Sequence, residues 1–266
     1  MPTASNGSVS LYYRREGESG GDGGNVPVVF VPEAGLGGWS WGWQHAALTG
    51  PYETVVWDLR GTGRSDAPKG PYAMETLVDD LETILEAIGA RNAHLVGAGL
   101  GGAVALTAAR TSTRVESLSL FGTAARGDAF DLEPLFASPD DRSGLRTSLE
   151  AGLSADFLDE QPEVVDGIVD WRAEGDATRE GWASQTAALE GFDATDSLVS
   201  VTQPTRVFHG TDDALVQPSA GRELANGLPR GEFVPLEGAA HLATIERSRT
   251  VNDRLLGFLE TKATDE

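Results

Sequence analysis

A glycine-rich stretch at residues 97–102 constrains the fold of this chain more than any other feature. The apolar residues 94–96 before it predict a buried strand, and the alanine-rich residues after it predict a helix that ends at about Arg110. A strand that turns sharply into a helix is the repeating unit of a parallel sheet covered by helices. The same order recurs along the chain, which is therefore expected to have an α/β fold.

The other expected elements follow the same alternation. Strands are predicted at residues 8–14, 26–31, 53–57, 115–121, 205–209 and 232–235, and those at 26–31 and 53–57 are short apolar runs typical of buried strands. Residues 77–88 predict an amphipathic helix, because apolar residues recur there at helical spacing and Gly89 follows. A final helix is expected near the end of the chain, and the glycine-rich residues 17–24 are expected to form a hairpin or loop. We predict a mostly parallel sheet with helices on both faces.

Residues 127–198 break this alternation. They are acidic, have a helical period and contain no convincing strand. We therefore predict two units: an α/β core made of residues 1–126 and 199–266, and an inserted helical lid at residues 127–198.

The charge balance is strongly acidic, with 41 Asp and Glu against 20 Lys and Arg and a formal net charge of −21. The acidic residues alternate with patterned apolar segments, which indicates a folded domain with a carboxylate-covered surface rather than disorder. At about 1 M salt the screening length is roughly 3 Å, so repulsion across such a surface is largely suppressed. We expect a halophilic-type protein, whose anionic surface disfavours nucleic acid or acidic lipid as a partner.

Several components are not expected. The chain has no cysteine, which excludes disulfides and thiolate metal sites, and we expect neither a metal nor another cofactor. Its first residues lack a charged and then apolar signal, and no run approaches 18 apolar residues. The expected location is therefore cytoplasmic, with no membrane partner. The expected partner is a small-molecule substrate or ligand, and the sequence leaves the oligomeric state open.

Two interpretations of residues 97–102 compete. Gly97, Gly99 and Gly102 match the dinucleotide fingerprint G-x-G-x-x-G, and the same turn matches the nucleophile elbow G-x-S-x-G with Gly99 in place of serine. A dinucleotide site needs an acidic residue about 20 positions later, at the end of the next strand. That strand instead ends in Phe-Gly-Thr-Ala-Ala at residues 121–125, so the elbow is favoured.

Two later signals complete a pattern. Residues 209–213 run from a strand into an acidic turn that ends in Asp212 and Asp213, and residues 238–242 form a small-residue loop that contains His241. Elbow, acid and histidine in this order resemble the α/β-hydrolase superfamily over nearly the whole chain. The resemblance implies that Asp213, or less favourably Asp212, is the acid and that His241 is the base. It also implies that the backbone amides of Ala34 and Leu100 are the oxyanion donors.

The chain departs from this family twice. Gly99 has no hydroxyl, so no acyl-enzyme can form there. Glu33 stands where the family commonly has a glycine after a histidine, and a carboxylate facing that loop would oppose a developing oxyanion. Glu33 has two possible roles: it acts on the site as an auxiliary acid or by tuning His241, or it points away and pairs with Arg60 or Arg64.

Three functions remain open. The leading hypothesis is a small-molecule enzyme in which His241, oriented by Asp213, is a general base that activates water or abstracts a substrate proton. The second is a degenerate, non-catalytic ligand-binding homologue. The third is an esterase with a relocated nucleophile, for which Thr123 is the candidate. The other histidines are expected to be structural (His94 and His209) or on a helix surface (His45).

Overall fold

Within residues 2–17 and 26–263, the protein forms one eight-stranded sheet with the order β1-β2-β4-β3-β5-β6-β7-β8. The structure is a computed structural model, and it describes residues 2–17 and 26–263. The strands are β1 (Thr3–Asn6), β2 (Val9–Glu16), β3 (Val28–Val31), β4 (Thr54–Trp57), β5 (Ala93–Ala98), β6 (Val115–Phe121), β7 (Thr205–Gly210) and β8 (Gly231–Leu236). The pairs β1–β2 and β2–β4 are antiparallel, and all other pairs are parallel.

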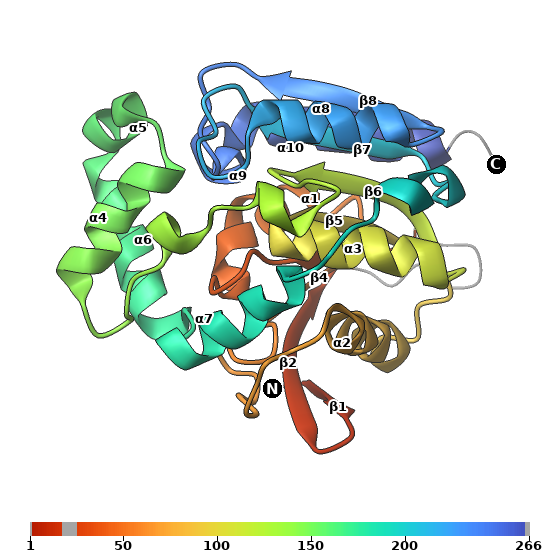
Figure 1. The fold of residues 1–266 in the computed structure, drawn as a ribbon, viewed down its shortest axis with the longest axis horizontal. Helices are drawn as coiled ribbons and strands as arrows, with labels where there is room; N and C mark the ends of the chain where they lie inside the picture. Colours follow the sequence, from red (N-terminus) through yellow and green to blue (C-terminus); the bar gives the residue numbers. More distant parts are fainter. Residues whose placement is uncertain (1, 18–25, 264–266) are drawn as a thin grey trace.

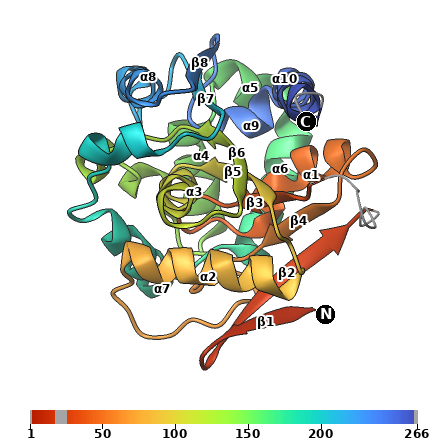
Figure 2. The ribbon, with the colours of Figure 1, turned by 90° about the vertical axis from the view of Figure 1, so that its right-hand side faces the viewer.

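Helices cover both faces of this sheet, as the view along its edge shows (Figure 2). One face carries α2 (Met74–Ala87), α3 (Leu100–Thr111) and α8 (Pro218–Gly227); the other carries α1 (Gly42–Leu48), α9 (Ala243–Glu246) and α10 (Ser248–Ala263). All four residues of β3 are fully buried, because Val29 and Val31 join the core on one face while Val28 and Phe30 join the core on the other. Burial on both sides explains the continuous apolar runs in the sequence. The predicted fold class is confirmed.

Some elements differ from expectation. β1 was not expected: Ala4 is its one buried residue, and pairing with β2 holds it in the sheet. β2 continues through Arg14, Arg15 and Glu16, because their backbones pair with β4 although their side chains are charged. Helix α8 was also not expected. The expected loop at residues 17–24 lies, apart from Gly17, outside the described residues.

A helical segment connects β6 to β7. It contains α4 (Arg142–Gly152), α5 (Ala155–Glu160), α6 (Pro162–Gly175) and α7 (Arg179–Thr186), and it lies beside one end of the sheet (Figure 1). Backbone hydrogen bonds join it to core loops, among them those from Leu242 N to Gly152 O (2.7 Å) and from Ala177 N to Gly35 O (2.8 Å). These loops follow β3 and β8, so the helical segment packs over the carboxyl ends of these strands.

Within the residues that the structure describes, no helix combines the length and the apolar character needed to cross a bilayer.

Candidate functional site

The turn between β5 and α3 has the sharp geometry that its glycines predict. Gly99 has φ 47° and ψ −113°, a left-handed conformation that glycine adopts without strain, and its N–H donates to Phe121 O (2.9 Å). A Cβ at Gly101 would overlap the carbonyl oxygens of Val31 and Pro32. Glycine at position 101 therefore allows the start of α3 to approach the end of β3 closely, which brings the two loops of the site together.

Glu33 projects into this junction and is only 2% exposed. Its Oε1 accepts hydrogen bonds from Ala34 N (2.6 Å) and Leu100 N (2.9 Å). Leu100 N is the first amide of α3, where the helix dipole favours a negative charge. The two amides expected to be oxyanion donors thus converge on one oxygen, and that oxygen belongs to the chain itself.

The carboxylate of Glu33 lies where a side chain at position 99 would lie. A Cβ built on Gly99 would overlap Oε2 of Glu33, so the carboxylate fills the volume that any side chain at position 99 would need. The observed position of Glu33 therefore requires glycine at position 99. The alternative that Glu33 pairs with Arg60 or Arg64 is wrong: Arg60 is bound to Asp80 (2.5 and 2.6 Å), and Arg64 Nη1 donates to the hydroxyl of Tyr12.

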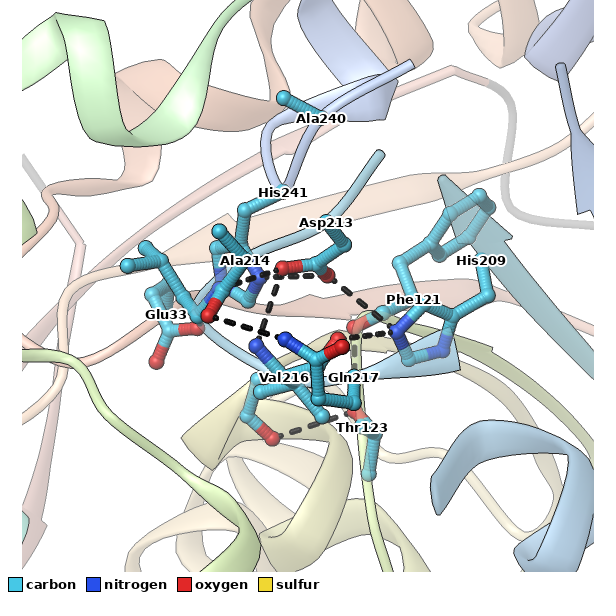
Figure 3. A network of polar contacts seen from close by, with 12 residues as sticks. Glu33, Phe121, Thr123, His209, Asp213, Ala214, Val216, Gln217, Ala240 and His241 are labelled. Atoms are coloured by element: carbon cyan, nitrogen blue, oxygen red, sulfur yellow. Dashed lines mark hydrogen bonds and ion pairs between the residues drawn. The ribbon is translucent and has the colours of Figure 1, made fainter. Parts of the chain in front are cut away.

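His241 lies between two carboxylates, as Figure 3 shows. Its Nε2 is 2.9 Å from Glu33 Oε2, and its Nδ1 is 2.9 Å from Asp213 Oδ2. Asp213 is held by its other oxygen, which accepts from Leu215 N and Val216 N (3.0 Å each) in the turn after β7. The neighbouring acidic residue, Asp212, is exposed, so Asp213 is the aspartate that meets the histidine.

This arrangement favours the protonated form of His241. Burial alone would lower its pKa, but the charge and hydrogen bond of Asp213, and then those of Glu33, raise the pKa of His241 to about 10. Both ring nitrogens face carboxylate oxygens, an arrangement that suits an imidazolium, which donates from each nitrogen. The burial of Asp213 would raise its pKa, but the charge of His241 and hydrogen bonds from His209 and His241 hold that pKa well below its ordinary value.

The other candidate residues have clear positions. The hydroxyl of Thr123 donates to Phe121 O (3.0 Å) and Gly99 O (3.2 Å), so it is bound to backbone carbonyls beneath the turn. His209 Nε2 is 2.7 Å from Val216 O and 3.2 Å from Asp213 Oδ2, a positioning contact that the sequence prediction of a structural histidine did not include. His45 is buried, with 3% exposure, and does not lie on a helix surface as expected.

The site is closed to solvent. Asp213 and His241 are 2% and 6% exposed, and a cavity of about 10 Å³ lies next to Ala34. This cavity has room for about one water molecule. It is lined by Leu36 from the loop after β3 and by apolar and charged residues of the helical segment, among them Leu135, Trp182 and the ion pair of Arg172 and Asp176 (2.7 Å).

Comparison with known proteins identifies relatives that match nearly the whole length of this chain. A family model described as "Alpha/beta hydrolase family" matches residues 28–254. A protein of Variovorax paradoxus named "Putative carbamate hydrolase RutD" is 31% identical over 267 residues, which cover 94% of this chain and 96% of that protein. The crystal structure of the enol-lactonase from Burkholderia xenovorans is 28% identical, with a TM-score of 0.85 over 97% of this chain and 100% of that one.

Proposed function

Because this chain belongs to the alpha/beta hydrolase family, we propose that it is a small-molecule hydrolase that works without a serine nucleophile. In this proposal the His241–Asp213 pair transfers the protons. One observation carries it: His241 is hydrogen-bonded through both ring nitrogens, to Asp213 and to Glu33, beside the Gly99 turn. A buried imidazole held in this way is suited to proton transfer.

Ordinary serine-type acyl transfer does not fit this site. RutD and the enol-lactonase are named for a carbamate and an enol lactone, and both are acyl compounds. In acyl transfer the amides of Ala34 and Leu100 would stabilise the oxyanion of the substrate, but here they already bind Glu33 Oε1. Position 99 also lacks an attacking hydroxyl. The reaction must therefore use an attacking oxygen other than a serine hydroxyl, together with the proton carried by His241.

The charge state of His241 sets the order of events. With a pKa of about 10, His241 is protonated near neutral pH and cannot accept a proton at the start of a cycle. It first donates a proton to the substrate and then, as a neutral imidazole oriented by Asp213, accepts one from water. The general base expected from the sequence thus becomes a general acid first and a base second.

A substrate screen in molar KCl tests this proposal. Purified protein is assayed with short esters, lactones, carbamates and epoxides, and every responsive substrate is assayed again with His241→Gln and Asp213→Asn. We expect each of these substitutions to reduce turnover by about 10²–10⁴-fold, the usual contribution of a positioned acid–base group. His94→Gln is the matched control, because His94 is also buried and binds Ser117 away from the site (2.8 Å). Unchanged turnover of every responsive substrate by His241→Gln would falsify the proposal.

A second candidate is a non-catalytic homologue. The observation that favours it is the burial of Glu33, which places the protein's own carboxylate on both oxyanion donors and closes the site. If this candidate is correct, the folded wild-type protein turns over none of the compounds in the screen. Glu33→Ala would then open the pocket, and small carboxylic acids such as acetate would raise the melting temperature of that variant but not of the wild type.

We also propose that the protein works in very salty water. The formal net charge of −21 supports this, because repulsion among surface carboxylates destabilises the folded state until salt screens it.

A further inference from the structure

We infer that the helical segment between β6 and β7 positions the Glu33–His241 pair, and that Gln185 is the residue that places Glu33. The inference concerns the arrangement of the site, and its consequence for turnover rests on the proposed function. Gln185 lies on α7 and is 0% exposed. Its side chain contacts Gly35, which is 150 positions away in the chain and lies in the loop that carries Glu33.

Glu33 is the first residue of a tight turn. Leu36 N donates to Glu33 O (3.1 Å), and Gly35 has φ 77°, the left-handed conformation that a type II turn requires at its third residue. A Cβ at Gly35 would lie 2.7 Å from a ring carbon of Trp182, so glycine also allows α7 to approach the turn closely. Within the turn, Ala34 N donates to Glu33 Oε1 (2.6 Å). The direction of the Glu33 carboxylate therefore depends on the position of this turn.

The helical segment binds both backbone groups of Gly35. Gly35 N donates to Gln185 Oε1 (2.7 Å), and Gly35 O accepts from Ala177 N (2.8 Å). The amide of Gln185 is itself fixed, because its Nε2 donates to Arg60 O (2.7 Å) and to the hydroxyl of Thr62 (2.5 Å). Gly35 is buried, so loss of the Gln185 oxygen would leave its N–H without this partner. An unpaired buried N–H is costly, and the turn would therefore rearrange to satisfy it.

The loop that carries His241 is bound to the same helical segment on both sides of the histidine. After it, Leu242 N donates to the last carbonyl of α4 (2.7 Å). Before it, Ala240 N donates to Oε1 of Glu246, a buried carboxylate. The other oxygen of Glu246 accepts from Ser154 N (3.0 Å), between α4 and α5. Glu246 thus joins the histidine loop and the helical segment through one side chain.

Both members of the ion pair are therefore attached to one part of the chain. The 2.9 Å contact between Glu33 Oε2 and His241 Nε2 joins the loops after β3 and β8, and the helical segment is hydrogen-bonded to each loop. Hydrogen bonds weaken steeply beyond their usual length, so displacement of either loop by about 1 Å would weaken this contact. The helical segment supplies none of the charged groups of Glu33, His241 and Asp213, yet it sets their spacing. A purely structural segment would be held to the core without affecting this pair.

Titration of ¹⁵N-labelled His241 measures this positioning without a substrate. The charged groups that contact the ring are Glu33 and Asp213, and they raise the pKa of His241 to about 10. Gln185→Met removes the amide and keeps the size of the side chain. In this variant the midpoint of His241 should fall by about one pH unit or more, because Glu33 is no longer held against the ring. Glu246→Gln leaves one of two backbone amides without its acceptor, and the midpoint should fall in that variant too.

Gln203→Met is the matched control. The side chain of Gln203 donates to Ala109 O in the last turn of α3 (3.1 Å), away from the site, so its loss should leave the midpoint unchanged. If Gln185→Met does not fold, Thr62→Val replaces it, because this change removes a hydrogen bond that orients the Gln185 amide. An unchanged midpoint in the folded variants at positions 185 and 246 would overturn the inference. A fall of the same size in Gln203→Met would also overturn it, because it would reflect general loosening of the fold.

Turnover separates this inference from the proposed function. If His241 acts first as an acid, kcat/KM of each responsive substrate declines at alkaline pH, as His241 loses its proton. In Gln185→Met this decline should begin at a lower pH, by the same shift as the midpoint. A shifted midpoint in a protein that turns over no compound of the screen would support the inference and contradict the proposed function. An unchanged midpoint with His241-dependent turnover would overturn the inference and support the proposed function.

Discussion

The Glu33→Gln substitution should change the charge state of His241 with little change in side-chain size. In the wild type, Glu33 Oε2 and His241 Nε2 are 2.9 Å apart, and the pKa of His241 is about 10. Two opposite unit charges at that distance interact by about 6 kcal/mol at an effective dielectric constant of about 20, and this value is an upper bound for the loss. Removal of an adjacent opposite charge lowers a titration midpoint by about one to three pH units, which corresponds to roughly 1–4 kcal/mol.

Nuclear magnetic resonance of ¹⁵N-histidine-labelled protein measures this midpoint. The chain has four histidines, and His94 is easily distinguished, because burial lowers its pKa to about 4. We expect His241 to be an imidazolium at pH 8 in the wild type, with its signal assigned by its absence from His241→Gln. In Glu33→Gln the same signal should titrate at a lower pH. A neutral His241 at pH 8 in the wild type, or an unchanged midpoint in Glu33→Gln, would refute the charge assignment.

The same shift makes stability depend on pH. The pKa of His241 is higher in the folded state, at about 10, than its ordinary value of 6.5. This contribution to the free energy of unfolding is therefore fully present below pH 6.5 and is lost as pH rises toward 10. The loss is about 5 kcal/mol at most. Urea unfolding at constant salt should show this decline in the wild type and a shallower one in Glu33→Gln; equal slopes would contradict the coupling.

Three further predictions concern the turn, a buried histidine and the surface. Gly99→Ser should destabilise the protein by about 1–3 kcal/mol, because the new side chain would overlap Glu33. The double variant Glu33→Ala with Gly99→Ser removes this overlap, and it should gain labelling by a fluorophosphonate probe and hydrolysis of 4-nitrophenyl acetate. A double variant that folds but is not labelled would contradict the argument that Glu33 fills the space of a side chain at position 99. The pKa of His94 is lowered to about 4, so the free energy of unfolding should fall by about 3 kcal/mol between pH 6.5 and 4. That fall should be absent in His94→Asn. The melting temperature should rise between 0.1 and about 2 M KCl because salt screens the net charge of −21, and a fall would contradict the halophilic interpretation.

The sequence by itself determined most strands of the sheet and the order of the site loops. The strand β6 (Val115–Phe121) was predicted at its observed bounds. The predicted strand at residues 26–31 contains β3 (Val28–Val31), which is continuously apolar because it is buried on both faces. The turn at Gly99, the acidic turn that ends in Asp213 and the loop of His241 were also readable, because glycine conformations and strand ends are local properties of the chain.

Only the tertiary structure decided where Glu33 points and, through it, the charge of His241. The carboxylate is held by amides of Ala34 and Leu100 and by a ring 208 positions away in the chain, and no local pattern encodes that meeting. The burial of His45 and the pairing of β1 were missed for the same reason. Long-range packing brings these groups together, and the resulting loss of water turns a glycine, a glutamate and a histidine into one coupled site.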